Sequence, residues 1–153
     1  METVLSVYTD GGCLGNPGPG GWAYVMVLRT FQGEKVVAEG KGAEKDTTNN
    51  RMELQAVISA LRALRAAKEL PWKAVVFTDS QYVQKGITAW IQLWKKNNWR
   101  TSDKQPVKNQ DLWKRLEVLT EDLTLQWEWV KGHAGNNWNE RCDRMTHEAI
   151  TAL

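Results

Sequence analysis

Two short stretches of the sequence each place an aspartate at the end of an apolar run. Segment 3–10 ends in Asp10 and segment 73–79 ends in Asp79, and both segments are typical of buried β-strands. If these strands are parallel neighbours, both acids project into the crevice at the carboxyl ends of the strands, where α/β sheets hold their ligands. The pattern indicates a site with two carboxylates at one edge of a sheet.

Two further acids could join this pair. Glu53 lies in the first turn of a predicted helix over 51–67, just off its apolar stripe, and Asp143 lies on the last predicted helix. Four carboxylates would form an oxygen-only site, which favours Mg²⁺ or Mn²⁺ over zinc. Each acid also has a simpler interpretation, because Glu53 could stabilise the helix dipole and Asp10 or Asp79 could cap a turn. Spacing alone does not decide between these interpretations.

A histidine lies in a glycine-flanked loop before the last predicted helix. His133 stands in Gly132-His133-Ala134-Gly135, and a neutral imidazole beside a metal site could move protons. The alternative is an ordinary surface histidine. The other histidine, His147, falls on the final helix and receives no predicted role.

Positive charge and tryptophan are concentrated in residues 85–115. This segment contains eight lysines and arginines and two aspartates, which gives it a net charge of +6, although the net charge of the whole chain is only +2. Cations interleaved with flat aromatic rings suit a phosphate backbone and the faces of sugars or bases. The alternative is a helical hairpin with core tryptophans and solvated lysines. Trp90 and Trp94 share a helix face, so both interpretations can hold for different tryptophans.

The hydrophobic pattern predicts the elements that position these residues. Strands are expected at 3–10, 22–30, 35–41, 73–79 and 123–130, and helices at 51–67, 80–88, 89–97, 109–120 and 138–150. The first strand is expected to end at Gly11-Gly12, followed by a glycine-rich loop over 14–21. Three successive strands favour antiparallel pairing, and the later alternation favours parallel strands. The expected fold class is α/β, a five-stranded mixed sheet flanked by helices.

Length and composition bound the protein class. A chain of 153 residues has room for one ordinary domain, and 42% hydrophobic with 25% charged residues excludes disorder. No apolar run approaches the ~18 residues of a membrane span, and the N-terminus lacks the features of a signal peptide. Two cysteines, expected to be reduced thiols, are too few for a disulfide scaffold. We therefore expect a single cytoplasmic domain.

Five longer motifs carry a family resemblance. The stretches are YTDGGCLGNPGPGGW, TTNNRMEL, FTDSQYVQKGITAWIQLWKKNNW, PVKNQDLWKRL and WEWVKGHAGNNWNERCD. In this order they resemble the ribonuclease H family, type 1, in its bacterial form. The resemblance implies the ribonuclease H-like mixed sheet. It also implies an endonuclease that cleaves the RNA strand of RNA–DNA hybrids with little sequence specificity, leaving 5′-phosphate and 3′-hydroxyl ends.

The resemblance assigns roles to individual positions. It implies that Asp10, Glu53, Asp79 and Asp143 hold two Mg²⁺ ions, with Mn²⁺ as a substitute, and that His133 assists proton transfer or product release. Asp10 would bridge the ions, with Glu53 and Asp79 on one ion and Asp143 on the other. The positions that would contact hybrid sugars, base edges or the DNA-strand phosphate are Cys13, Asn16, Thr48, Asn49, Asn50 and Gln81. A basic protrusion at about 85–115 would hold the DNA strand, and its candidate contact residues are Trp90, Trp94, Lys95, Lys96 and Trp99.

The implied protein is one ribonuclease H catalytic domain over 1–153, a monomer with no membrane or obligate protein partner. Two departures from the family pattern stand out: Asn136-Asn137-Trp138 replaces a His-Pro-Glu-like stretch, and Gly12 replaces a frequent serine. Two other hypotheses about the function remain open. A non-catalytic hybrid-binding module predicts the loss of a carboxylate, and an integrase or transposase-type core predicts the absence of TTNNRMEL and of the basic tryptophan-rich segment.

Overall fold

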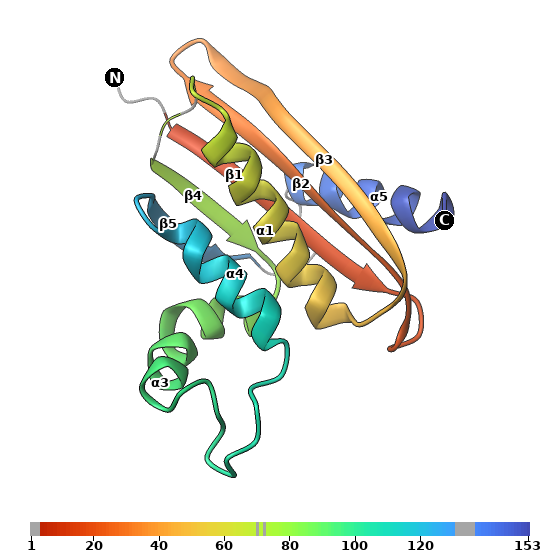
Figure 1. The fold of residues 1–153 in the computed structure, drawn as a ribbon. Coiled ribbons are helices and arrows are strands. Elements are labelled where there is room, and N and C mark those ends of the chain that lie inside the picture. Colours follow the sequence, from red (N-terminus) through yellow and green to blue (C-terminus); the bar gives the residue numbers. More distant parts are fainter. Residues whose placement is uncertain (1–3, 70, 72, 131–136) are drawn as a thin grey trace.

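The computed structural model describes residues 4–69, 71, 73–130 and 137–153. Its centre is a five-stranded sheet in the order β3-β2-β1-β4-β5 (Figure 1). The strands are β1 (Val4–Cys13), β2 (Gly18–Thr30), β3 (Gly33–Thr47), β4 (Lys73–Thr78) and β5 (Thr124–Trp129). The predicted α/β class and five-stranded mixed sheet are confirmed.

The pairing directions follow from the connections between the strands. β1, β2 and β3 pair antiparallel through short turns, whereas β4 pairs parallel with both β1 and β5. Parallel neighbours need a long crossover, which helices supply here. The consequence for function is that β1 and β4 end side by side at the same edge of the sheet.

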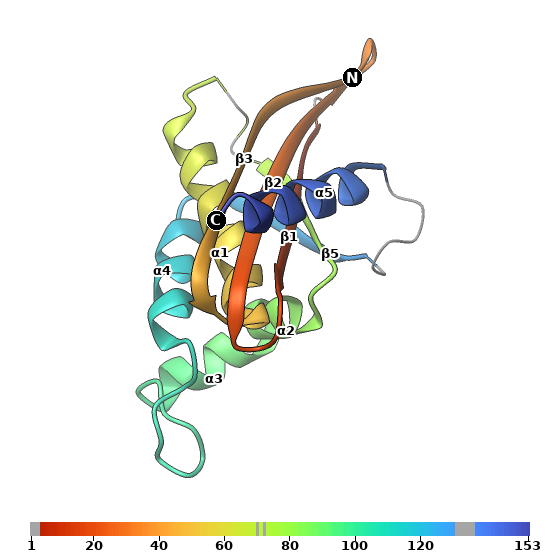
Figure 2. The ribbon, with the colours of Figure 1, turned by 90° about the vertical axis from the view of Figure 1, so that its right-hand side faces the viewer.

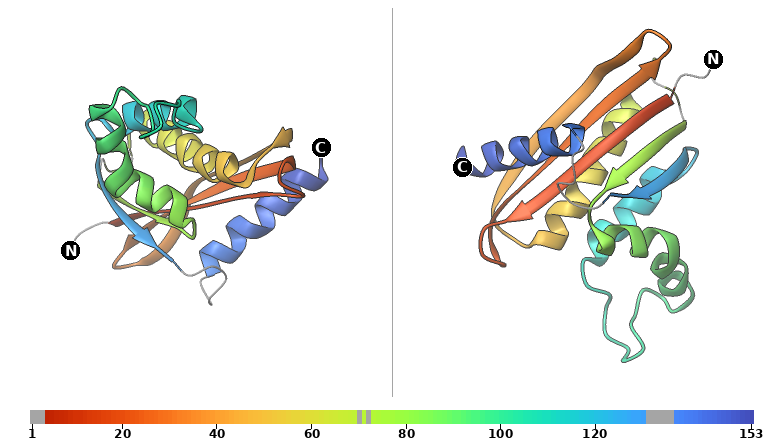
Figure 3. Two further views of the ribbon diagram at one scale, coloured as in Figure 1. Left: turned by 90° about the horizontal axis from the view of Figure 1, so that it is seen from below. Right: turned by 180° about the vertical axis from the view of Figure 1, so that it is seen from behind.

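The helices lie on both faces of the sheet. They are α1 (Asn49–Ala66), α2 (Gln81–Lys85), a π-helical turn η1 (Gly86–Trp90), α3 (Ile91–Lys96), α4 (Gln110–Thr120) and α5 (Asn137–Thr151). Figures 2 and 3 show α1 and α4 on one face and α5 across the other. Among the described residues, no helix is both long and apolar enough to cross a membrane.

The core lies mainly between α1 and the sheet. The apolar stripe predicted for α1 is buried along its length, and it packs against Leu5 and Val7 of β1 and Val76 of β4. A smaller cluster under α5 includes Tyr8 and Cys142. Because side chains alternate along a strand, β1 contributes to both clusters. Both cysteines are free thiols, as predicted.

The three N-terminal strands are longer than predicted. β1 continues through Gly11-Gly12 to Cys13, and β2 begins at Gly18 inside the stretch predicted to be a loop. β3 likewise extends to Thr47. Backbone pairing between β1 and β2 reaches Cys13 opposite Gly20, and this tertiary pairing overrides the turn preference of glycine. The other strands and α1, α4 and α5 match their predicted ranges to within two residues.

The two helices predicted at 80–88 and 89–97 form one helical run from Gln81 to Lys96. The π-helical turn interrupts this run where Gly86 meets the fully buried ring of Trp113. A Cβ at Gly86 would lie 2.0 Å from Cη2 of that ring. The absence of a side chain at this position therefore lets the helical run pack directly on α4.

Replacing Gly86 with alanine should destabilise the protein by about 2–3 kcal/mol, because the enclosed Trp113 ring has no room to move away. Urea unfolding would measure the change. Gly12→Ala is the matched control, since a Cβ there would meet only Cγ2 of Thr146 at 3.9 Å. Equal unfolding midpoints for the two variants would contradict the steric argument.

Candidate active site

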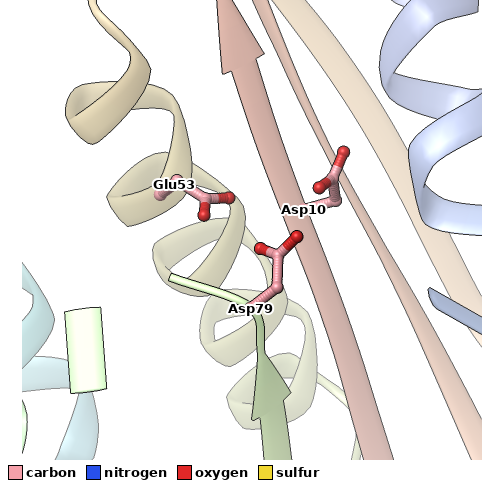
Figure 4. A group of neighbouring side chains, drawn as sticks. All are labelled: Asp10, Glu53 and Asp79. Atoms are coloured by element: carbon pink, nitrogen blue, oxygen red, sulfur yellow. The ribbon is translucent and has the colours of Figure 1, made fainter. Parts of the chain in front are cut away.

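Three carboxylates from three elements meet at the edge where β1 and β4 end. Figure 4 shows Asp10 on β1, Glu53 on α1 and Asp79 just after β4 pointing toward one another. One carboxylate oxygen from each lies within 4.8 Å of those from the other two. The parallel pairing of β1 with β4 thus brings together two aspartates that are 69 positions apart in the sequence.

Side-chain hydrogen bonds hold the two strand ends in place. The last paired residues of β1 and β4 are Tyr8 and Phe77, and one step further the Thr9 hydroxyl donates to the Phe77 carbonyl at 3.1 Å. After β4, the Thr78 hydroxyl accepts a hydrogen bond from the Ser80 backbone N–H at 3.0 Å. Both threonines are buried, so the aspartates that follow them start from a rigid backbone.

Glu53 lies one turn further into its helix than predicted. The Thr48 hydroxyl caps α1 by accepting from the Arg51 backbone N–H, so the helix begins at Asn49 and Glu53 is in its second turn. Its side chain is buried, with 5% relative exposure for the residue. Stabilisation of the helix dipole does not account for a carboxylate in this position, because that effect falls off within the first turn.

Burial and the neighbouring acids set the electrostatics of Glu53. Burial raises the pKa of Glu53 well above its ordinary value, the negative charges of Asp79 and Asp10 raise it further, and a backbone hydrogen bond from Gly11 opposes the shift. Negative charge gathered in a buried site is costly unless a cation compensates it. Carboxylate oxygens at this spacing are the donors that Mg²⁺ and Mn²⁺ prefer, so the residues present fit a divalent cation.

The raised pKa of Glu53 predicts how stability varies with pH in the absence of metal. Between about pH 4.3, the ordinary glutamate value, and the raised folded value, the folded chain binds more protons than the unfolded chain. The contribution of Glu53 to stability therefore falls as pH rises through this window. Glu53→Gln removes that loss, so the variant should be more stable than the wild type in EDTA at neutral pH.

Urea unfolding of both proteins in EDTA at several pH values would measure this effect. The stability advantage of Glu53→Gln should shrink as pH falls below the ordinary glutamate pKa of about 4.3, where Glu53 becomes protonated in both the folded and unfolded states of the wild type. An advantage that does not change with pH would mean that the charge of Glu53 is not its cause.

A cavity of about 510 Å³ surrounds the three acids. Asp143 of α5 lines it, which brings the fourth predicted acid to the same space without placing it in the tight group of three. The other predicted residues that line the cavity are Cys13, Asn49, Asn50 and Gln81. The predicted residues outside its lining are Asn16, Thr48, Trp90, Trp94, Lys95, Lys96 and Trp99.

Two of the residues that do not line the cavity support those that do. Thr48 caps α1, and the Asn16 side-chain oxygen accepts a hydrogen bond from the Asn49 backbone N–H at 3.0 Å. Asn16 therefore ties the β1–β2 turn to the start of α1. Cys13 is held in the same turn, with its Sγ 3.1 Å from the Gly15 carbonyl oxygen.

The structure adds a residue that the sequence analysis left without a role. His147 lines the cavity, and its Nε2 lies 3.6 Å from Oδ1 of Asp143, one helical turn earlier. Because side chains four residues apart on a helix are neighbours, the sequence could have predicted this contact between His147 and Asp143. His133, with the rest of 131–136, lies outside the described residues, so its predicted role stays a prediction.

The rings of the tryptophan-rich segment pack on one another and on α4, as the interpretation of core tryptophans predicts. Trp113 is fully buried, and the rings of Trp90, Trp94 and Trp99, half-buried, form a chain of contacts with centroids 5.9 and 6.0 Å apart. Trp94 also packs edge-on against Trp113 at 5.4 Å. Lys95 and Lys96 are both exposed, and Lys95 pairs with Glu117 at 3.4 Å.

Trp138, which departs from the family pattern, contacts residues of β1, β3 and its own helix. The Trp138 indole N–H donates to the Glu34 carboxylate at 2.6 Å, and its ring lies 6.5 Å from that of Tyr8. The Arg141 guanidinium lies 5.9 Å from the Trp138 ring. Trp138 therefore connects the beginning of α5 to the beginning of β3.

Comparisons with known proteins agree with the fold and identify the family. The family model described as RNase H matches residues 2–151. A ribonuclease H of Treponema denticola is 54% identical, over 97% of this chain and 98% of that protein. The crystal structure of LC9-RNase H1, a type 1 RNase H with the type 2 active-site motif, has a TM-score of 0.86 at 31% identity, over 97% of this chain and 72% of that one. LC11-RNase H1 in complex with RNA/DNA hybrid shares the fold, with a TM-score of 0.70 at 24% identity over 97% of both chains.

Proposed function

The chain belongs to the ribonuclease H family and is a nuclease of that family, and we propose from this premise that it hydrolyses the RNA strand of RNA–DNA hybrids. The observation that carries the proposal is the convergence of Asp10, Glu53 and Asp79 in the lining of a cavity of about 510 Å³. A protein of the same fold, LC11-RNase H1, was solved with an RNA/DNA hybrid bound. The products would carry 5′-phosphate and 3′-hydroxyl ends.

The acids are proposed to hold two divalent cations, Mg²⁺ or in its place Mn²⁺. Asp10 would bind both ions. Glu53 and Asp79 would bind one of them, and Asp143, on α5, would bind the other. Two such ions supply water activation and neutralise charge on the leaving 3′-oxygen. The chain's own contribution is a preorganised set of carboxylate oxygens whose mutual repulsion a bound cation would relieve.

Selection of RNA over DNA is proposed to come from amide side chains around the cavity. Asn49, Asn50 and Gln81 are exposed and line it, and Asn16 holds the backbone of Asn49. An amide can donate to and accept from a ribose 2′-hydroxyl, the group that distinguishes RNA from DNA locally. Cys13 lies in the same turn as Asn16 and would contact the same strand.

The DNA strand is proposed to lie along Thr48 and the segment 85–115. Its net charge of +6 suits phosphate contacts, and the half-buried rings of Trp90, Trp94 and Trp99 offer partly exposed aromatic faces. The exposed Lys96 is the freer of its two central lysines, because Lys95 already pairs with Glu117. Contacts to sugars and phosphates carry little sequence information, so we expect cleavage with little sequence specificity.

The remaining expectations stay predictions. They are a role for His133 in proton transfer or product release, a single catalytic domain over 1–153, a monomeric state, the absence of an obligate protein partner and a cytoplasmic location.

A substrate panel tests the proposal directly. We expect end-labelled RNA in a hybrid to be cut with Mg²⁺ or Mn²⁺ and to stay intact in EDTA, while single-stranded RNA and duplex DNA of the same sequence stay intact throughout. Hybrid binding without cleavage in either metal would favour a binding module. Cleavage of duplex DNA would favour a core of the integrase or transposase type.

A further inference from the structure

Asp79 differs from the other two clustered acids in how its backbone is held. Asp10 lies within β1 opposite Ala23 of β2, and Glu53 lies within α1. Asp79 belongs to neither a strand nor a helix, because β4 ends at Thr78 and α2 begins at Gln81. The two-residue link of Asp79 and Ser80 is held by the cap that Ser80 forms on α2 and by contacts from outside the helix and the strand.

One such contact comes from the end of the edge strand. Trp129 is the last residue of β5 and pairs with Thr78, and its indole Nε1–H donates to the Asp79 carbonyl oxygen at 3.1 Å. The next residue continues the pairing, since the Val130 N–H donates to the Thr78 carbonyl at 2.9 Å. The carbonyl groups of Thr78 and Asp79 are therefore both hydrogen-bonded to residues at the end of β5.

This bond joins a rigid donor to the residue that carries the carboxylate. A tryptophan side chain has two rotatable bonds and one donor, so its N–H fixes the position of the carbonyl with little freedom. Rotation of the Asp79 backbone would swing its carboxylate relative to Asp10 and Glu53, which lie on separately anchored elements. Partners that orient ligating residues in this way influence metal affinity although they do not touch the metal.

We propose that Trp129 is a positioning residue whose indole N–H holds Asp79 in the geometry needed to bind a divalent cation. This inference rests on the proposed metal-binding role of the three acids. Trp129 is 39% exposed, which places it at the edge of the core rather than inside it.

The test compares Trp129→Phe with Trp127→Phe. The first substitution keeps an aromatic ring and removes the N–H that reaches Asp79. The second makes the same change two residues earlier on β5, where the ring packs against the main core. Mn²⁺ binding to each free protein would be measured by isothermal titration calorimetry, together with the hybrid affinity in EDTA and the Mg²⁺ dependence of cleavage.

We expect Trp129→Phe to weaken Mn²⁺ binding by roughly threefold to tenfold, the value of one hydrogen bond. The Mg²⁺ concentration for half-maximal cleavage should rise by a similar factor, while the rate at saturating Mg²⁺ and the hybrid affinity in EDTA stay within about twofold of the wild type. Trp127→Phe should leave Mn²⁺ affinity unchanged, even if it lowers the unfolding midpoint.

Three outcomes would overturn the inference. Unchanged Mn²⁺ affinity in Trp129→Phe would show that the hydrogen bond does not position Asp79, and an equal loss in both variants would show a general effect on β5. Weaker hybrid binding with unchanged Mn²⁺ affinity would make Trp129 a substrate contact instead. Asp10→Asn distinguishes a failure of the positioning role from a failure of the metal site. If Mn²⁺ affinity survives this substitution, the proposed metal site itself is contradicted.

Discussion

Replacing Asp10 with asparagine is expected to lower the rate of hybrid cleavage by roughly a thousandfold or more. A carboxylate oxygen of Asp10 lies within 4.8 Å of oxygens of both Glu53 and Asp79, and an amide in its place carries no charge to hold a cation. Removing one preorganised electrostatic contact costs about 10²–10³ in rate, and a bridging ligand serves two ions at once. Single-turnover cleavage of a labelled hybrid in Mg²⁺ would measure the loss.

The same substitution should make the metal-free protein more stable. The charge of Asp10 is one cause of the raised pKa of Glu53, so its removal relieves repulsion inside the buried site. Asp122→Asn is the matched control: Asp122 is exposed and has a φ of 66°, a conformation that asparagine tolerates well. An Asp10→Asn protein that is inactive and also less stable would indicate misfolding rather than loss of a ligand.

A methyl group at Gly11 is expected to separate the two elements that carry Asp10 and Glu53. A Cβ at Gly11 would lie 2.4 Å from the backbone nitrogen of Glu53 and 2.4 Å from the carbonyl carbon of Met52. Backbone atoms of a helix cannot rotate away as a side chain can, so α1 would have to move off β1. Gly11→Ala should therefore reduce cleavage by about a hundredfold and stability by about 2–4 kcal/mol.

The neighbouring glycine supplies the control for this prediction. Gly12→Ala introduces the same methyl group one residue later, where the nearest atom is Cγ2 of Thr146 at 3.9 Å. Its cleavage rate should stay within about threefold of the wild type. This open space also explains how the position can accept the serine frequent in the family. Cleavage should be assayed at low temperature, where Gly11→Ala is mostly folded, and equal rates for the two variants would contradict the argument.

The sequence was sufficient to predict most of the fold. The apolar stripe of α1, the alternation in β5 and the β-branched run of β4 are local patterns, and the structure confirms their positions to within two residues. The order of strands and helices also predicted which strands are parallel, because parallel neighbours require a crossover. Two of the boundary predictions that were wrong concern glycines, at Gly11-Gly12 and at the start of β2, and the close packing of α4 on Gly86 was not predicted.

These errors share a physical reason. Local rules treat glycine as a turn former because its backbone is flexible, whereas in this protein β1 pairs with β2 through Gly12 and α4 packs onto Gly86. Whether a glycine ends an element or permits a close approach depends on what packs against it. That neighbour is distant in the sequence, so no local pattern contains it.

The identity of the four acids and of the amide side chains was determined by the sequence alone, because the residue types and the motifs around them are local. The tertiary structure decided how they act together: which oxygens lie within 4.8 Å, that Glu53 is buried and holds its proton more tightly, and that His147 and Trp129 lie beside the acids. Burial and through-space charge depend on contacts between elements far apart in the chain. These properties therefore exist only in the folded protein.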